Sequence, residues 1–129
     1  MFGTFQQSNL RIEVNASEQK IRDSLLLPDQ FRQWLYPQTF SGGLQERLQT
    51  GTTFTSWIGP ISILHQIEVA EPNELRMTLS QGIDGYHEWH WGEGWVQSNI
   101  AGISLLPINL GQTFSLLRLR MFLTADAKI

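Results

Sequence analysis

The residues Tyr86-His87-Glu88-Trp89-His90-Trp91-Gly92-Glu93-Gly94-Trp95 decide the fold, because an aromatic strand-like segment meets a glycine-containing turn there. A second strand-like run extends from Trp95 to Ser104, and a long apolar segment follows it to Ile129. Four of the five tryptophans lie between Trp57 and Trp95, so bulky rings crowd onto a few neighbouring strands. Such crowding exceeds what a plain core needs, and it indicates a walled cavity.

The size and composition of the chain indicate one globular domain that spans residues 1–129. Apolar residues make up 41% of the chain, and its net charge of −3 offers no basic surface for nucleic acid or anionic lipid. The absence of cysteine excludes disulfides, thiolate catalysis and thiolate metal sites. We expect no signal peptide and no membrane insertion, because no long apolar run exists, and therefore a cytoplasmic protein.

The first third of the chain predicts a strand followed by two short helices. Apolar residues alternate with polar ones from Leu10 to Val14, which is the period of a strand with one buried face. Ser17 is expected to cap a helix that Pro28 ends. Asp29 is expected to cap a second helix that stops before Pro37.

The middle of the chain predicts an antiparallel meander, because short turns separate successive strand-like runs. Glycine, proline and asparagine supply the breaks between these runs. The six predicted strands are Gly43–Leu48, Thr52–Ile58, Ile61–Ala70, Leu75–Gln81, Gly85–Trp91 and Trp95–Ser104.

The segment after Pro107 has the period of a helix with two apolar stripes on roughly opposite sides. A helix lying on one sheet needs only one stripe. The other must be covered by a loop, a ligand or another subunit, or be partly exposed. The first stripe consists of Leu110, Phe114, Leu117 and Met121, and the second of Ile108, Leu116, Leu119 and Leu123.

The order of these elements resembles that of the START-domain/polyketide-cyclase superfamily, which includes carriers similar to the birch pollen allergen. The resemblance rests on Val14-Asn15-Ala16-Ser17 before a short helix, on Pro28 to Trp34, on a strand led by Gly51, and on the Glu71-Pro72-Asn73 turn. It implies an α+β helix-grip fold, in which a curved antiparallel sheet of about seven strands wraps around the C-terminal helix. It also implies an apolar cavity for a hydrophobic small molecule, and it supplies no catalytic residue and no cofactor. The chain is short for this group, which implies a small cavity.

The length of the loop in the aromatic hairpin determines which side chains of its two strands share a face of the sheet. A three-residue loop, Gly92-Glu93-Gly94, would pair Trp91 with Trp95. One face would then carry His87, Trp89, Trp91, Trp95, Gln97 and Asn99, and the other Tyr86, Glu88, His90, Val96, Ser98 and Ile100. Burial of tryptophan favours the first face as the cavity wall, with His87 and Asn99 as polar contacts for a ligand. Aromatic packing across the hairpin without any ligand is the alternative.

Further candidates for the cavity wall come from the short helices and the neighbouring strands. The resembled fold places Trp34, Tyr36 and Phe40 where the short helices close one end of the cavity, although these residues also suit a plain core. His65, on an otherwise apolar strand face, is expected in the core or the cavity wall. The residues predicted to contact a ligand are Trp34, Tyr36, Phe54, His65, Met77, His87, Trp89, Trp91, Asn99 and Phe114.

The histidines of the hairpin suggest two chemical alternatives. Glu88 and His90 lie two residues apart on one strand face, and a buried carboxylate–imidazole pair would suit a general base that abstracts a proton beside a carbonyl. Exposed polar neighbours on an outer sheet face are the commoner arrangement. His87 and His90 are three residues apart on a strand and point to opposite faces, so we expect no metal site.

Three hypotheses for function follow from the sequence. The first is binding or transport of a hydrophobic small molecule, such as a lipid or an aromatic polyketide, in a cavity between sheet and helix. The second is a cyclase- or dehydratase-like enzyme, which needs a titratable residue among His65, His87, Glu88 and His90 inside the cavity. The third is a ligand-free module that forms a homodimer through Leu116, Leu119 and Leu123.

Overall fold

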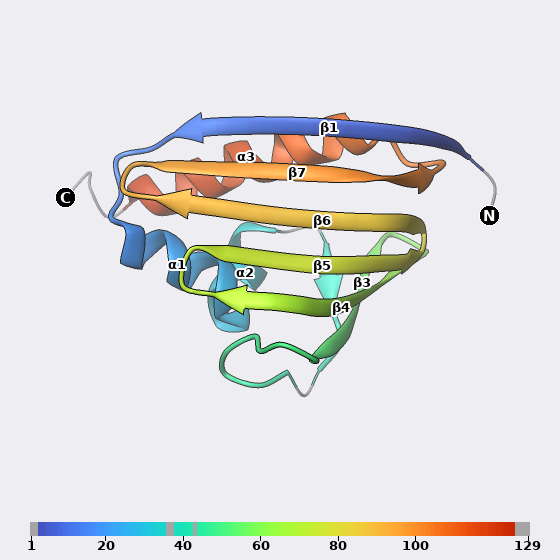
Figure 1. The fold of residues 1–129 in the computed structure, drawn as a ribbon, viewed down its shortest axis with the longest axis horizontal. Coiled ribbons are helices and arrows are strands. Elements are labelled where there is room, and N and C mark those ends of the chain that lie inside the picture. The colour runs from blue at the N-terminus through green and yellow to red at the C-terminus, as the bar shows by residue number, and fades with distance from the viewer. Residues whose placement is uncertain (1–2, 36–37, 43, 126–129) are drawn as a thin grey trace.

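The computed structural model describes residues 3–35, 38–42 and 44–125, and these form one antiparallel sheet with helices on one side (Figure 1). The sheet has seven strands in the order β1-β7-β6-β5-β4-β3-β2. The predicted α+β class and the antiparallel meander are confirmed. The strands are β1 (Thr4–Glu13), β2 (Thr39–Phe40), β3 (Thr53–Ile58), β4 (Ile61–Glu71), β5 (Glu74–Gln81), β6 (Ile83–Gly92) and β7 (Trp95–Ser104), and the helices are α1 (Glu18–Leu26), α2 (Pro28–Trp34) and α3 (Ile108–Thr124).

The helices α1 and α2 form largely where the sequence predicts them. The side chain of Ser17 accepts a hydrogen bond from the backbone N–H of Lys20, which confirms Ser17 as the cap of α1. The prediction that Asp29 caps α2 is wrong. Leu27 occupies that position, and Pro28 takes the first helical turn, where its missing N–H costs nothing.

One predicted strand, Gly43–Leu48, does not form. Gly43 lies outside the described residues, and residues 44–48 are irregular, while the short strand β2 pairs with β3 instead. The buried side chain of Leu48 explains the apolar signal, because it packs into the core as part of a loop. The backbone N–H of Leu48 donates to the carbonyl of Leu26, which fixes this loop to the end of α1.

The hairpin between β6 and β7 has a two-residue loop, so the predicted three-residue loop is wrong. Gly92 pairs with Trp95, and only Glu93 and Gly94 lie between the strands. Gly94 adopts a φ of 77°, which a residue without Cβ accommodates readily. The shorter loop moves every side chain of β7 to the opposite face from the predicted one.

Helix α3 packs against the sheet with the second of its two apolar stripes. Leu116, Leu119 and Leu123 are buried, with Leu119 and Leu123 at 0% exposure. The first stripe, Leu110, Phe114, Leu117 and Met121, is exposed. A homodimer formed through Leu116, Leu119 and Leu123 is therefore ruled out, because those side chains already pack within their own chain.

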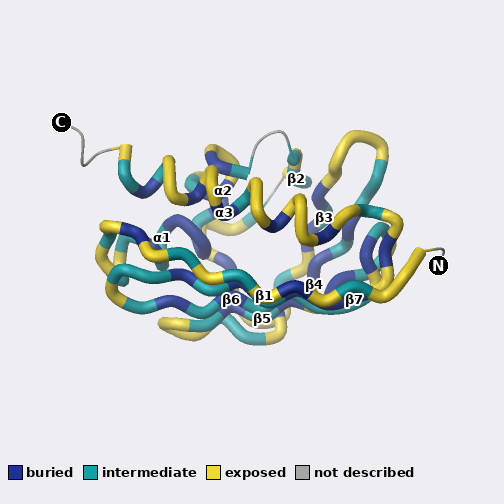
Figure 2. Tube along the Cα trace, turned by 90° about the horizontal axis from the view of Figure 1, so that it is seen from above, coloured by how far each residue is buried: buried dark blue, intermediate teal, exposed yellow. Residues whose placement is uncertain are grey.

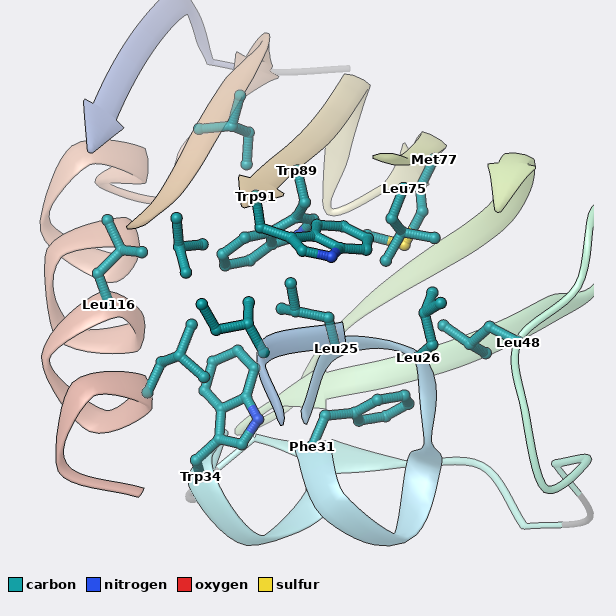
Figure 3. Packing of buried hydrophobic residues seen from close by; sticks show 14 of the residues in the cluster. Leu25, Leu26, Phe31, Trp34, Leu48, Leu75, Met77, Trp89, Trp91 and Leu116 are labelled. Carbon is teal, nitrogen blue, oxygen red and sulfur yellow. The ribbon is translucent and has the colours of Figure 1, made fainter. Parts of the chain in front are cut away.

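The three helices cover the concave face of the curved sheet, and the core lies between these two layers (Figure 2). Side chains from α1, α2, α3 and the strands point toward one another there (Figure 3). Trp91 from β6 is 1% exposed and Trp34 from α2 is 3% exposed, so both belong to this core. Among the described residues, no helix is long and apolar enough to cross a membrane.

Candidate ligand cavity

Two adjoining chambers lie between the concave face of the sheet and the helices. The first, which we call the aromatic chamber, has a volume of about 90 Å³, and the second, the aliphatic chamber, about 120 Å³. An engineered apolar cavity of about 150 Å³ binds benzene, whereas drug-sized ligands need roughly 300 Å³ or more. Each chamber is therefore on the scale of a single small ring. Five residues border both chambers and mark their junction: Gln38, His65, His87, Trp89 and Ser115.

The aromatic chamber is built from rings that α2 and the strands β2, β3 and β6 contribute. Phe31 of α2 stacks on Phe54 of β3 with ring centroids 6.1 Å apart. Trp34 meets Trp89 edge to face at 6.1 Å, and its indole N–H donates to the carbonyl of Ser24. These contacts hold the walls in place without filling the space between them.

The aliphatic chamber has a different wall, formed by branched side chains from the sheet and the start of α3. A small number of polar groups interrupt it, namely Ser98, Gln112 and the four polar residues of the junction, Gln38, His65, His87 and Ser115. The aliphatic wall consists of Ile58, Ile63, Leu79, Ile83, Ile100, Leu106 and Ile108. Apolar walls with few polar groups are typical of small-molecule sites.

His65 of β4 is held at the junction by a stacked ring and a buried hydroxyl. Its ring lies parallel to that of Phe54, with centroids 4.5 Å apart. The Oγ of Ser56 lies 2.8 Å from its Nε2, and Gln38 donates to the same Oγ. Burial lowers the pKa of His65 from 6.5 to about 4, so the imidazole is neutral at pH 7.

His87 of β6 is held in the same manner from the other side. Its Nε2 lies 2.7 Å from the Oγ of Ser98, and Gln112 of α3 donates to that Oγ over 2.9 Å. Burial, and secondly the charge that His65 would carry, lower the pKa of His87 from 6.5 to about 3. The cavity therefore contains two neutral imidazoles, each fixed by a serine and a glutamine.

Comparison with known proteins identifies the architecture but gives no close relative. No protein-family model and no curated protein sequence matches the chain. CV1439 from Chromobacterium violaceum has the same fold with a TM-score of 0.72 at 18% identity, over 91% of this chain and 96% of that one. Major latex-like protein 151 from Panax ginseng matches with a TM-score of 0.65 at 10% identity, over 96% of this chain and 98% of its own.

A third structure is DynU16, a protein in the dynemicin biosynthetic locus. It matches 93% of this chain with a TM-score of 0.70 and 15% identity, and this chain spans 48% of DynU16. The chain has the helix-grip fold. The resemblance to the START-domain/polyketide-cyclase superfamily is thus confirmed at the level of the fold, whereas identities this low carry no activity or ligand with them.

Within this helix-grip structure, most of the residues predicted to contact a ligand border the chambers. A residue that contacts the ligand must border a chamber, and these residues do. Their contact with a ligand stays a prediction. These residues are Trp34, Phe54, His65, Met77, His87 and Trp89.

Three predicted contacts lie elsewhere, and a fourth cannot be placed. Trp91 is buried in the core away from both chambers, and Phe114 is 58% exposed on the outer side of α3. The prediction for Asn99 is wrong because the two-residue hairpin loop turns this side chain to the outer face, where it accepts a hydrogen bond from Gln97. Tyr36 lies outside the described residues.

The sequence reasoning missed the serines and glutamines that hold the two histidines. The predicted three-residue loop places Ser98 on the face opposite His87, and this is the same error of loop length that misplaces Asn99. Gln112 could have been found, because it lies on the buried stripe of α3 between Ile108 and Leu116. A glutamine at such a position needs hydrogen-bond partners, which marks a polar site inside the core.

Glu88 and His90 lie on the outer face of the sheet and not in the cavity. Glu88 pairs with Arg76 at 2.9 Å, and the Nε2 of His90 lies 3.4 Å from the other carboxylate oxygen of Glu88. An acid–base role for this pair inside the cavity is therefore excluded. In the part of the chain that the structure describes, no three histidine or acidic side chains gather as metal ligands would.

Proposed function

We propose that this protein binds a small hydrophobic molecule in the cavity between its sheet and its helices. The observation that carries the proposal is the pair of apolar chambers, which meet at two neutral imidazoles. An apolar cavity with a few fixed polar groups is what a small-molecule site requires.

The volume of the chambers limits the size of the ligand. At about 90 and 120 Å³, they suit a molecule of one or two small rings or a short branched chain. A long-chain lipid would need the chambers to open considerably. We therefore favour a compact aromatic or alicyclic ligand over a lipid.

The proposal is tested by blocking the junction of the chambers. Ser115 of α3 borders both chambers, so Ser115→Phe is expected to fill the junction with a ring. The matched control is Thr113→Phe, which adds the same ring at an exposed position of the same helix. Isothermal titration calorimetry with toluene should show binding to the unmodified protein and to Thr113→Phe, and at least about tenfold weaker binding to Ser115→Phe. Absence of binding to the unmodified protein, or equal binding to both variants, would contradict the proposal.

A cyclase- or dehydratase-like activity is the second candidate. It is favoured by one observation, the presence of His65 and His87 at the cavity wall. Against it stand the pKa values of about 4 and about 3, which make both imidazoles weak bases. Incubation with a 1,3-diketone that carries a 2-hydroxyphenyl group, in which the phenol oxygen closes on the distal carbonyl and water is lost, followed by mass spectrometry for that loss, tests it. Turnover that disappears in His87→Gln but not in His90→Gln would favour the enzymatic function. Absence of turnover by the unmodified protein would contradict it.

A further inference from the structure

The side chain of Gln112 has one orientation that its surroundings allow, and this orientation fixes the hydrogen of the Ser98 hydroxyl. The Nε2 of Gln112 lies 2.8 Å from the carbonyl oxygen of Ser98 and 3.2 Å from that of Ser8, and backbone carbonyls can only accept. The same Nε2 donates to the Oγ of Ser98 over 2.9 Å. The Oγ of Ser98 therefore accepts from Gln112, and its own hydrogen goes to the Nε2 of His87, which lies 2.7 Å away.

This hydrogen bond sets the tautomer of His87. A neutral imidazole carries one hydrogen, and a nitrogen that accepts a hydrogen bond does not hold it. Burial lowers the pKa of His87 to about 3, so the ring is neutral at pH 7. Because its Nε2 accepts from Ser98, the hydrogen of His87 lies on Nδ1. His87 therefore presents an N–H donor at its second nitrogen.

The Nδ1–H of His87 is unpaired and remains accessible. No described residue forms a hydrogen bond with this nitrogen. Three side-chain atoms of the described residues are unpaired and fully enclosed, namely the Nδ1 of His65, the indole nitrogen of Trp91 and the Oε1 of Gln112. The Nδ1 of His87 is not one of these, so it retains surface that a small molecule can touch, in agreement with the partial exposure of the residue.

The accessible surface of His87 lies inside the cavity. Its ring packs against that of Trp89, with centroids 4.7 Å apart, and protein surrounds it closely enough to lower its pKa. Because His87 borders both chambers, its unpaired N–H is a hydrogen-bond donor at their junction. A ligand that gives such a donor a partner gains affinity, since a buried polar group without one is costly.

We propose that the ligand carries a neutral carbonyl group, whose oxygen accepts a hydrogen bond from the Nδ1–H of His87 while the rest of the molecule lies against the apolar walls. This inference rests on the proposed function, and it specifies the chemistry of the ligand. A carbonyl oxygen brings no hydrogen of its own, so this one donor satisfies it, whereas a hydroxyl group would bring a hydrogen that needs an acceptor as well. Compact ketones, lactones and quinones belong to the proposed class.

A carboxylate fits this cavity poorly. Both imidazoles are neutral at pH 7, and no lysine or arginine among the described residues borders either chamber. Moving a carboxylate from water into such a chamber without a cation beside it is costly. The cavity therefore selects a neutral carbonyl compound over an acid of the same shape.

The test compares cyclohexanone with methylenecyclohexane, which has the same ring and carries a methylene group in place of the carbonyl oxygen. The ketone loses more on leaving water, so the ratio of the two affinities is compared between proteins and not within one. His87→Phe keeps a ring at this position and removes the donor. Titrations followed by amide NMR signals at pH 7 should show that His87→Phe weakens cyclohexanone relative to methylenecyclohexane by about fivefold to tenfold.

Two control variants test whether His87 is the donor. His90→Phe makes the same change on the outer face of the same strand, and it should leave the ratio within about twofold of that of the unmodified protein. Ser115→Ala removes a hydroxyl from a residue that also borders both chambers, and it should leave the ratio within about twofold as well. A change in Ser115→Ala as large as that in His87→Phe would overturn the inference, because the donor would then not be the imidazole alone.

The outcomes separate this inference from the proposed function. If both ligands bind and His87→Phe leaves their ratio unchanged, as it would if a retained water already paired with the Nδ1–H, the carbonyl inference fails while the proposed function stands. A stronger dependence on His87 for cyclohexanol or cyclohexanecarboxylate than for cyclohexanone would also overturn it. If none of the four molecules binds to the unmodified protein, the proposed function itself fails for ligands of this size.

A direct measurement on the unmodified protein covers the possibility that His87→Phe, which leaves Ser98 without its acceptor, does not fold. Nitrogen-15 chemical shifts of an imidazole distinguish its two neutral tautomers. At pH 7 the expected result is hydrogen on the Nδ1 of His87. Cyclohexanone should move the signal of that hydrogen to higher frequency, and methylenecyclohexane should not. Hydrogen on the Nε2 of His87, or an equal response to both ligands, would overturn the inference.

Discussion

The Oγ of Ser98 lies 2.7 Å from the Nε2 of His87, and this contact depends on the loop that joins their strands. Because only two residues separate β6 from β7, Ser98 lies opposite Trp89 on the concave face, beside His87. One more residue in the loop would turn Ser98 outward and Asn99 inward. The loop itself is fixed by the segment that follows β1. The carbonyl of Gly94 accepts a hydrogen bond from the backbone N–H of Val14, and the N–H of Gly94 donates to the carbonyl of Ala16.

The first prediction concerns the hydroxyl of Ser98. Ser98 is fully buried, and Ser98→Ala would leave the Nε2 of His87 without a donor. We expect a loss of about 1–3 kcal/mol in the free energy of unfolding, measured by urea denaturation. The control is Ser62→Ala, which removes an exposed hydroxyl bonded to Gln81 and should stay within about 0.5 kcal/mol. Equal effects of the two substitutions would mean that the Ser98–His87 contact contributes nothing.

The second prediction is a loss of stability in mild acid. His65 and His87 have pKa values lowered to about 4 and about 3, so the folded protein keeps them neutral where the unfolded chain, with a histidine pKa near 6.5, takes up protons. Stability from this source is complete above pH 6.5, and it declines as the pH falls from 6.5 toward 4. The slope should approach about 1.4 kcal/mol per pH unit for each histidine.

This acid sensitivity is measured by urea denaturation between pH 7 and pH 5, where carboxylates titrate little. His65→Gln removes one of the two groups, so its slope should be about half that of the unmodified protein. If stability does not change over this interval, the two imidazoles are not buried in the neutral form.

Much of the fold could be predicted from the sequence because its signals are local. The alternation of apolar residues along β4 and β5, the cap at Ser17 and the helical period after Pro107 each depend on neighbouring residues only. The failures involve tertiary context. Leu48 is buried because the loop that carries it packs against the end of α1. The residues 44–48 alone do not distinguish such a loop from a strand.

The site was predictable to a lesser degree. Aromatic residues such as Trp89 and Phe54 could be assigned to the cavity wall because burial of rings is a strong signal. The polar partners could not, since the inward face of β7 depends on a loop that is one residue shorter than the glycines suggested. Likewise, both stripes of α3 are apolar, and only the packed structure shows that the stripe of Leu119 faces the sheet.

The third prediction concerns the close approach of β6 and β7 at Gly85, which pairs with Gly102. A Cβ at Gly85 would overlap the carbonyl oxygen of Ala101, so Gly85→Ala must push the strands apart. We expect a loss of about 2 kcal/mol or more in the free energy of unfolding. Gly111→Ala, in helix α3 with no atom within 4 Å of the added Cβ, should instead stabilise the protein by about 0.5–1 kcal/mol. The expected changes in the free energy of unfolding therefore have opposite signs at the two glycines. Losses of similar size at both would contradict the prediction.

The fourth prediction separates the two stripes of α3. Leu119 is 0% exposed and packs in the core, whereas Leu117 is 47% exposed. Leu119→Ala should therefore lower the free energy of unfolding by about 2–5 kcal/mol, because it removes buried methyl groups and leaves a cavity. Leu117→Ala, the same change two residues earlier, should alter it by no more than about 0.5 kcal/mol in a monomer. Thermal or urea denaturation at several protein concentrations measures both. A large effect of Leu117→Ala that grows with concentration would show that the exposed stripe is covered by a second copy, because only then does its burial depend on association.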